Sequence, residues 1–400
     1  MADPIEDESV DVGDVAPGLV TDARGSRRKV LTIAGTRPEV IKLAPVIRLL
    51  GADPERFESR LCVTAQHREL LDQALRPFRI TPDYDLDIMT PGQSLAELTG
   101  RALVSLDEVL AQFKPDLVLV QGDTTTAFCG ALAAYYRNVA IGHVEAGLRT
   151  SNKRAPFPEE INRCLISQLA DFHFAPTERA RLALVASGIP ERRVFVTGNT
   201  VVDALLWMHC QVTERPPALA ATLGSEFEGR LVVLVTLHRR ESFGVPFENI
   251  CRAIRDVADS CPDVLFVYPV HLNPGVREPV GRLLGSHPRV RLIEPLPYDE
   301  FVWLLGRACV VLTDSGGVQE EAPVLGKPVL VARETTERPE GVDSGSAQLV
   351  GVGHQAIVSA LMRLLHSEEV RAEMGHANSP YGDGRSAERI VSILGGAWPA

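Results

Sequence analysis

Short apolar runs alternate with segments of helix length along most of the chain, and this alternation occurs in two successive series. The first series contains KVLTIAG, RLCVTA, DLVLVQG, VAIGHVEA, FHFAP and RVFVTG, and the second contains LVVLVTLH, VLFVYPVH, VRLIEPL, CVVLTDSGG, KPVLVAR and AQLVGVG. Such runs with helical spacers are typical of parallel strands with crossover helices. We predict an α/β fold with two doubly wound, Rossmann-like sheets. The restart after a polar, Pro-containing segment favours two sheets over one closed barrel, although the period alone does not exclude a barrel.

Changes in composition give the domain limits that we expect. Residues 1–28 are rich in Asp, Glu, Gly and Ser, and we expect a disordered acidic tail. The first series predicts an N-terminal α/β domain over 29–197, and the second predicts a C-terminal α/β domain over 198–384. The final GRSAERIVSILGG predicts a helix within 385–400 that crosses back to the N-terminal domain.

The charge and the cysteines narrow the class of protein. A net charge of -11 argues against nonspecific binding of nucleic acid or anionic membranes. The sequence has no apolar stretch of about 20 residues and no basic-then-apolar N-terminus, so we expect a cytoplasmic protein without a membrane partner. Its seven cysteines are odd in number and scattered without a CxxC pair, which indicates reduced core residues.

One strand-to-helix turn, DSGGVQEE, has the character of an anion site. Gly316 and Gly317 would let backbone N–H groups at a helix N-terminus approach a phosphate, and Ser315 could add a hydroxyl donor. Glu321 lies on the same helical face as Gly317 and could accept from both hydroxyls of a ribose. The alternative is a plain N-cap followed by acidic residues, and we assign Glu320 to that capping role.

The segment GTRPEVIK combines capping signals with two cations. Thr36 and Glu39 have the spacing of a capping box, and Pro38 fits the first turn. Capping does not explain Arg37, since a cation is disfavoured at the positive end of a helix unless an anion lies nearby. We predict that Arg37 binds an anion, with a solvated surface arginine as the alternative, and that Lys42 either reinforces it or lies free.

Three carboxylates occupy positions where catalytic groups are expected. Asp123 and Glu145 directly follow apolar strands, and Glu159 opens a helix. Buried carboxylates at strand ends suit general acid or base catalysis, although each of the three could be a helix cap. His238 precedes two arginines and is either anion-facing or part of a surface ion-pair cluster.

Fingerprints of the common cofactors are absent from the sequence. Neither first strand leads into G-x-G-x-x-G, and there is no P-loop and no H-E-x-x-H. The alternating aspartates of DYDLD are typical of an exposed strand or loop. We therefore expect neither a redox cofactor nor a metal.

The motifs, taken in order, closely resemble those of the non-hydrolysing UDP-N-acetylglucosamine 2-epimerases from about Lys29 to Gly395. The matching segments are GTRPEVIK, VTAQHRELLDQ, GDTTT, GHVEAGLRT, PEEINR, TGNTVVDAL, HRRES, YPVHLNP, LTDSGGVQEEAP, GKPVLV and TTERPEG. The resemblance implies a GT-B-like two-domain fold, with the active site in the interdomain cleft, and a homodimer. Two departures are Leu237, where a smaller residue is expected, and Ser242, where many members have Asn.

The resemblance also implies roles for individual residues. UDP would bind to Arg37, Ser315, Gly316, Gly317 and Glu321, and the sugar would be surrounded by Lys42, Asp123, Glu145, Glu159, Arg163 and His238. Some bacterial members are activated by UDP-GlcNAc at a neighbouring site that involves the QHR segment. Gln66 and His67 are the candidates for that site in this chain.

The implied reaction is reversible inversion at C2, which converts UDP-GlcNAc to UDP-ManNAc. The C2 proton has no adjacent carbonyl, so the C1–O bond must break first or concertedly, giving a glycal and free UDP. Inversion needs acid/base groups on both faces of C2, with Glu145 or Asp123 favoured as the base. The alternatives are an epimerase for a modified UDP-HexNAc, a GT-B glycosyltransferase that uses a UDP-sugar, a hydrolysing epimerase, and an inactive sugar-nucleotide sensor.

Overall fold

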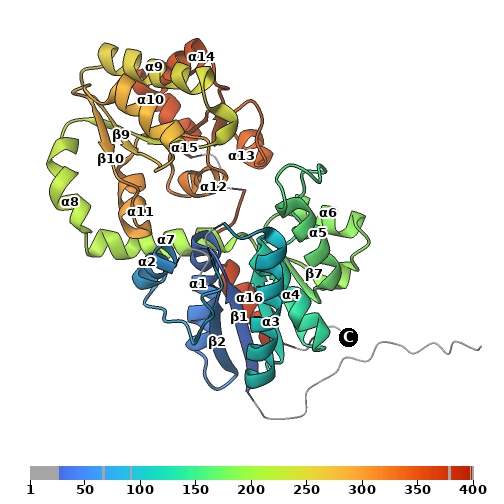
Figure 1. Ribbon diagram of the computed structural model, residues 1–400. Helices are drawn as coiled ribbons and strands as arrows, with labels where there is room; N and C mark the ends of the chain where they lie inside the picture. Colours follow the sequence, from blue (N-terminus) through green and yellow to red (C-terminus); the bar gives the residue numbers. More distant parts are fainter. Residues whose placement is uncertain (1–26, 65–67, 91, 377–379, 397, 399–400) are drawn as a thin grey trace, which may run out of the picture.

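The chain folds into two α/β lobes with a helix running between them (Figure 1). The computed structural model describes residues 27–64, 68–90, 92–376, 380–396 and 398. Each lobe is built around a parallel sheet, which confirms the predicted fold class. No helix in this described part of the chain has the length and apolar character needed to cross a membrane.

The first lobe contains a seven-stranded parallel sheet within the described residues. Its strands, in sheet order, are β3 (Tyr84–Asp85), β2 (Phe57–Val63), β1 (Arg28–Ala34), β4 (Leu117–Gln121), β5 (Ala140–Val144), β6 (Phe172–Ala175) and β7 (Val194–Val196). Its helices are α1 (Arg37–Gly51), α2 (Arg68–Phe78), α3 (Leu95–Phe113), α4 (Thr125–Tyr136), α5 (Glu159–Leu169) and α6 (Glu178–Ala186), with the 3-10 turn η1 (Glu191–Arg193). Every residue of β4 is buried, as expected for a central strand covered by helices on both faces.

The second lobe repeats the arrangement with six parallel strands among the residues described. In sheet order these are β10 (Val290–Ile293), β9 (Val264–Pro269), β8 (Leu231–Thr236), β11 (Val310–Thr313), β12 (Val329–Val331) and β13 (Ala347–Leu349). Its helical elements are η3 (Arg240–Ser242), α9 (Val245–Ser260), α10 (Pro274–Leu284), α11 (Tyr298–Arg307), α12 (Gly316–Val324), α13 (Pro339–Asp343), α14 (His354–His366) and α15 (Glu368–Gly375).

Both sheets reverse their strand order at one point, between β1 and β4 in the first lobe and between β8 and β11 in the second. Ligands of open parallel sheets bind at such reversals, beyond the carboxyl ends of the strands. The polar segments after these four strands contain Arg37, Asp123, His238 and Ser315. The topology alone therefore explains why residues far apart in sequence meet in the cleft.

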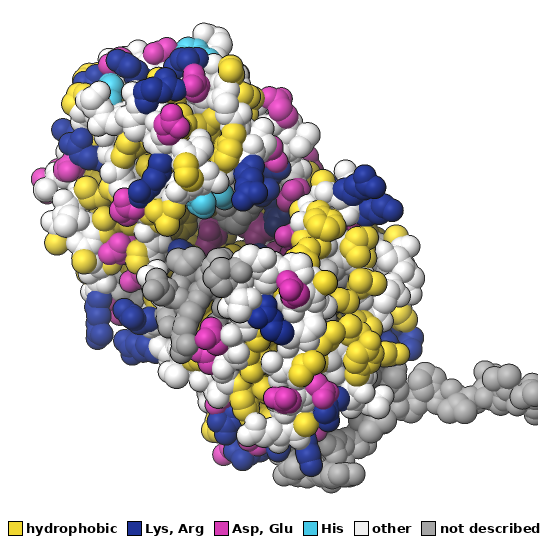
Figure 2. All heavy atoms as spheres, viewed as in Figure 1, with side chains coloured by type: hydrophobic (Ala, Val, Ile, Leu, Met, Phe, Trp, Pro, Cys, Tyr) yellow, Lys and Arg dark blue, Asp and Glu magenta, His cyan; other side chains and the backbone are white. Residues whose placement is uncertain are grey.

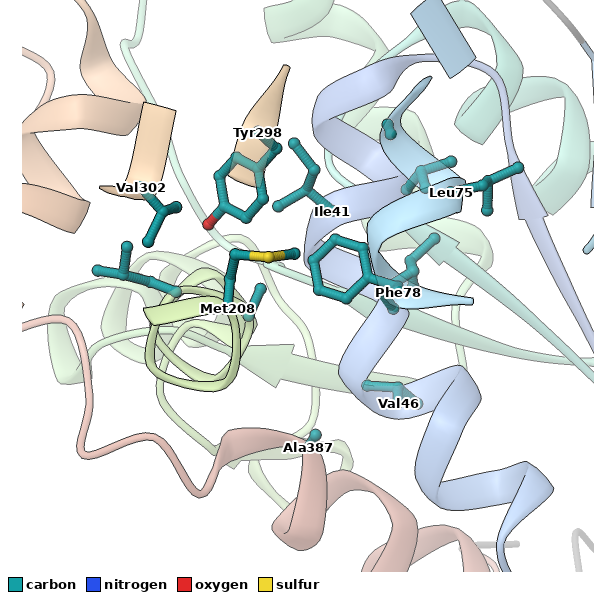
Figure 3. Close-up of a cluster of buried hydrophobic side chains, with 14 of the residues drawn as sticks. Ile41, Val46, Leu75, Phe78, Met208, Tyr298, Val302 and Ala387 are labelled. Atoms are coloured by element: carbon teal, nitrogen blue, oxygen red, sulfur yellow. The ribbon is translucent and has the colours of Figure 1, made fainter. Parts of the chain in front are cut away.

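Helix α7 (Thr200–Glu214) joins the lobes and contacts both of them. It packs against α1 of the first lobe and against α11 and α12 of the second, and α8 (Ala218–Leu223) and η2 (Gly224–Phe227) then lead to β8. Figure 3 shows the apolar cluster at this junction, where Met208 of α7 lies beside Phe78 and Tyr298. The rings of Phe78 and Tyr298 stack at 5.9 Å across the two lobes. Buried contact of this kind favours a defined hinge over freely moving lobes.

The chain crosses between the lobes a second time before α16 (Ser386–Gly395), which packs against α1 and α7 (Figure 1). The Ala387 N–H donates to Asp203 Oδ1 at 2.8 Å and fixes the start of α16 on α7. The two crossings touch, because the Asn199 N–H donates to Tyr381 O at 2.7 Å. A Cβ on Gly198 would lie 2.6 Å from Ser386 Oγ, so this approach requires glycine, which also has φ +88°.

Candidate active site

A cavity of about 340 Å³ lies between the lobes, at the carboxyl ends of the strands. Figure 2 shows the hollow between the two lobes, with acidic side chains inside it and histidine on its rim. Five predicted residues line the cavity from the first lobe, namely Lys42, Asp123, Glu145, Glu159 and Arg163. The second lobe contributes Arg239, Glu337 and Arg338. The structure thus brings together the whole predicted set of sugar-side residues except His238.

Glu145 is held in place by groups from both lobes. Lys42 Nζ lies 2.7 Å from each of its carboxylate oxygens, and Gln121 donates to Oε2. Although burial opposes ionisation, Lys42 and Arg338 lower the pKa of Glu145 below its ordinary value. The backbone of Glu145 has φ +63°, which is uncommon for a residue with a side chain and indicates that the surrounding contacts fix this conformation.

Asp123 lies in a different electrostatic environment. Arg163 donates to Asp123 Oδ2, and Asn162 Nδ2 donates to the Asp123 carbonyl at 2.9 Å. Burial raises the pKa of Asp123 above its ordinary value, with Arg163 opposing the shift and the charge of Glu145 adding to it. Two carboxylates whose pKa values move in opposite directions are what paired acid and base chemistry requires.

Glu159 begins α5 and reaches the cavity from a third direction. Its neighbour Glu160 is buried and accepts from the N–H groups of Thr150 and Ser151, at 3.0 and 3.1 Å. These bonds fasten the loop after β5 to the start of α5. Glu159 is thus presented to the cavity by a fixed helix end.

His238 is oriented by Asp314 at the cleft edge of the second lobe. The His238 N–H donates to Asp314 Oδ2 at 2.8 Å, and Nδ1 lies 3.2 Å from Asp314 Oδ1. The ring stacks on His271 at 5.5 Å and stays 39% exposed. Because Asp314 immediately precedes Ser315, this contact ties His238 to the predicted phosphate turn.

The turn at Ser315 leaves space for a ligand. Ser315 is the N-cap of α12, but its side chain makes no capping hydrogen bond. A Cβ on Gly316 would meet no atom closer than 3.9 Å, and one on Gly317 none closer than 4.0 Å. Packing therefore does not explain the two glycines, whereas close approach of an anion to the backbone would.

Arg37 and Glu321 face one another across the lobes. Arg37 Nη2 donates to Leu296 O at 3.0 Å, and Tyr298 Oη donates to Glu321 Oε1 at 2.8 Å. Burial raises the pKa of Glu321 to about 7, while burial lowers the pKa of Arg37 from its ordinary value. A neutralising phosphate near Arg37 would relieve this cost of burial.

One capping assignment made from the sequence holds only in part, and another is wrong. Thr36 occupies the N-cap of α1 without a side-chain capping bond, so the reciprocal capping box is incomplete. Glu39 interacts with Thr36 and also accepts from the Gly35 N–H at 3.1 Å and from Thr124 Oγ1 at 2.7 Å. Glu320 lies beyond the first turn of α12 and is 1% exposed. It accepts from Arg338 and from Asn199 at 2.9 Å, so it belongs to a buried polar network.

Sequence reasoning missed Arg338 and Asn199. Arg338 lies in the segment TTERPEG, which follows the apolar run KPVLVAR. This position after a predicted strand was the signal that could have identified it. Asn199 gave only an N-cap signal, since nothing local indicates contact with two carboxylates. The proposed activator residues Gln66 and His67 lie outside the described residues, and their assignment stays a prediction.

The fold and the charged cleft define a GT-B-like protein, with an anion-accepting turn in one lobe facing a carboxylate cluster in the other. The model of the UDP-N-acetylglucosamine 2-epimerase family matches residues 50–395. UDP-N-acetylglucosamine 2-epimerases from Salmonella typhimurium and Yersinia pestis are each 54% identical to this chain over 370 residues, which cover 92% of the chain and 98% of each relative. The crystal structure of UDP-GlcNAc 2-epimerase from Neisseria meningitidis bound to UDP-GlcNAc superposes with a TM-score of 0.85 at 48% identity, covering 92% of this chain and 99% of that one.

The chain therefore belongs to the UDP-N-acetylglucosamine 2-epimerase family. The predicted family and the predicted GT-B-like fold are confirmed.

Proposed function

We propose that the protein interconverts UDP-GlcNAc and UDP-ManNAc by inverting C2 of the sugar. The observation that carries this proposal is one cavity in which Glu145 is held as a carboxylate by Lys42, while burial favours the protonated form of Asp123. A transferase needs a nucleotide site and an acceptor site, but it has no need of an acid and a base on opposite sides of one carbon. Membership of the family adds independent support.

The proposed chemistry begins with departure of UDP. Breaking the C1–O bond spreads positive charge from C1 to the ring oxygen, which acidifies the C2 proton. Arg37, His238 and the Ser315 turn would stabilise the departing diphosphate, and fixed charges of this kind supply much of the barrier reduction in enzymes. Glu321 would hold the ribose hydroxyls and so place the leaving group.

Proton transfer at C2 follows from the electrostatics of the cavity. Glu145 is ionised in the resting site and would remove the C2 proton, while Asp123 would deliver a proton to the opposite face of the glycal. UDP would then add back at C1, so that bonds and protons balance. Glu159 lines the same cavity and would assist on one face. Lys42 and Arg163 would also contact the sugar or its phosphate.

The decisive test is a proton NMR time course of the purified protein with UDP-GlcNAc in D2O. We expect UDP-ManNAc with deuterium at C2. Unchanged substrate would overturn the proposal and direct attention to a modified UDP-HexNAc or to an acceptor-dependent transfer. Free mannosamine derivative with UDP would indicate hydrolysis of the glycal instead.

We further propose that the protein is a homodimer and works in the cytoplasm. Several large apolar side chains are exposed on the mutually packed helices α3, α4 and α5, namely Leu95, Val104, Tyr135, Tyr136, Ile161 and Leu165. A second copy of the chain is the partner that would cover this face, since homodimers bury apolar surface. The domain limits that we propose are 29–197 and 198–384, with the acidic tail 1–28 before them and 385–400 returning to the first domain.

A further inference from the structure

Asn199 lies at the first crossing between the lobes and contacts a carboxylate of each lobe. Its Nδ2 group lies 2.9 Å from Glu320 Oε2 and 3.4 Å from Glu145 Oε1. Its Oδ1 accepts from the Val201 N–H at 3.1 Å and caps α7. The residue is 2% exposed, so these contacts are made away from bulk water. Capping explains Oδ1 but does not explain why the two donors of Nδ2 point at two carboxylates.

Arg338 makes a second connection between the same two carboxylates. Its Nε donates to Glu320 Oε1, and its Nη2 lies 3.9 Å from Glu145 Oε1. Burial opposes the charge of Arg338, yet Glu320 and Glu145 raise its pKa above the ordinary value. Glu145 is therefore joined to Glu320 both through an amide and through a guanidinium.

The charges of this network balance. Lys42 and Arg338 supply the cations, and Glu145 and Glu320 supply the anions, all of them buried or nearly so. Removing one member of a buried, balanced network leaves an uncompensated charge, which is strongly unfavourable. Glu145 is thus linked through Arg338 to Glu320, although the two carboxylates belong to different lobes.

We propose that Asn199 and Glu320 are positioning residues that hold Glu145 in its catalytic placement, and that this placement forms only when the lobes are closed on one another. The inference rests on the proposed function of Glu145 as the base. Asn199 belongs to the crossing that any opening of the lobes must bend, while Glu320 and Arg338 move with the second lobe. Opening would separate Glu145 from Arg338 and from the shared amide. The base would then be assembled by closure, at the moment when water is excluded from the glycal.

Three variants test this proposal. Asn199→Ser keeps an acceptor for the cap of α7 but removes both bridging donors, and Asn199→Asp keeps the cap and adds a like charge between Glu145 and Glu320. Glu320→Gln keeps the shape and removes the charge that balances Arg338. Glu248→Gln is the matched control, because Glu248 also forms an ion pair with arginine, in its case with Arg252 and Arg282, but lies on the surface of the second lobe.

We expect each test variant to lower kcat by about 10- to 100-fold while the Kd for UDP stays within about 3-fold. In Asn199→Asp the acid limb of the kcat profile should move to higher pH, because an added anion disfavours ionisation of Glu145. Its other charged and polar neighbours, Lys42, Gln121, Asp123, Arg163 and Arg338, are unchanged in that variant. A purely structural role would lower the melting temperature and leave the acid limb where it was, which would overturn the proposal.

A measurement independent of turnover separates this inference from the proposed function. Small-angle X-ray scattering with and without UDP should show that the parent and Glu248→Gln become more compact, and that Asn199→Asp does not. If the parent does not epimerise UDP-GlcNAc but still compacts more than Asn199→Asp, the coupling of Asn199 to closure is supported and the assigned reaction is refuted. Equal compaction in Asn199→Asp and the parent, or no compaction in the parent, would overturn the coupling.

Discussion

Lys42 Nζ lies 2.7 Å from both carboxylate oxygens of Glu145, and both groups are buried in the cleft. This pair keeps the proposed base ionised. In Lys42→Met the burial of Glu145 is no longer offset by the adjacent cation, so the pKa of Glu145 should rise by at least about one unit. The base works as a carboxylate, so the acid limb of the kcat profile should lie at a higher pH in the variant than in the parent. The pH dependence of kcat checks this, and Lys42→Arg should retain the parent acid limb.

Asp123→Asn tests the other half of the acid and base assignment. Asparagine can still bond to Arg163 but cannot deliver a proton, so kcat should fall by about 10²- to 10⁴-fold. The Kd for UDP, measured by calorimetry, should change little because Asp123 lies on the sugar side of the cleft. Formation of UDP-ManNAc with deuterium at C2 at the parent rate would contradict the assigned role.

Tyr298→Phe addresses the nucleotide side. The variant removes the hydroxyl that donates to Glu321 Oε1, so the carboxylate loses a group that favours its ionised form. We expect the Kd for UDP at pH 7 to rise several-fold and to recover as the pH is raised above the new pKa of Glu321. Titration calorimetry at pH 7 and pH 8.5 measures both effects. Tyr84→Phe, on the edge strand β3, is the control and should bind UDP like the parent.

Glu39 gives a prediction about stability. Burial raises its pKa to about 7 from an ordinary 4.5, so the folded state binds a proton more tightly than the unfolded state. This contribution to stability is complete below pH 4.5 and is lost as the pH rises to 7, a change of about 3 kcal/mol. Glu39→Gln cannot titrate, so the parent should lose stability relative to this variant between pH 5 and pH 8. Urea unfolding at both pH values tests this, and an unchanged difference would refute it.

Leu165→Glu tests the dimer. Leu165 is 43% exposed on α5, and a charge there would have to be buried if a second copy covers that face. Light scattering should give a dimer for the parent and a monomer for the variant, with an unchanged melting curve at low concentration. Leu182→Glu, on the separate helix α6, should remain dimeric. A dimeric Leu165→Glu protein would rule out this face as the interface.

Alternation of strands and helices made the α/β fold predictable, because each element is specified by neighbours in sequence. The same logic singled out the ends of β4 and β5, where Asp123 and Glu145 follow buried strands and line the cavity, and their catalytic roles stay a prediction. It also singled out the turn from Ser315 to Gly317 as an anion site, and the structure shows that packing does not require the two glycines there. In each case the informative residues lie within one turn of a strand end.

Partners across the cleft could not be predicted in this way. Glu39 and Glu145 are both carboxylates close to strand ends, yet their pKa values move in opposite directions, because Lys42 faces only Glu145. Glu320 has the local pattern of a capping residue. Its place in a buried polar network becomes visible only from its contacts with Arg338 and Asn199 in the folded structure. These contacts and pKa shifts depend on how the two lobes pack against one another. The spacing of residues along one helix carries no information about the packing of the lobes.

The two chain crossings at Asn199 and Tyr381 have a mechanical consequence. Since they are joined by a hydrogen bond of 2.7 Å, any sliding of one lobe past the other would have to drag both segments together. Gly198 and Gly382 flank this contact with positive φ, and glycine tolerates the backbone changes that a rotation there would need. We expect the cleft to open mainly by such a rotation. One interlobe distance, followed with a pair of spin labels, would then suffice to report the state of the whole molecule.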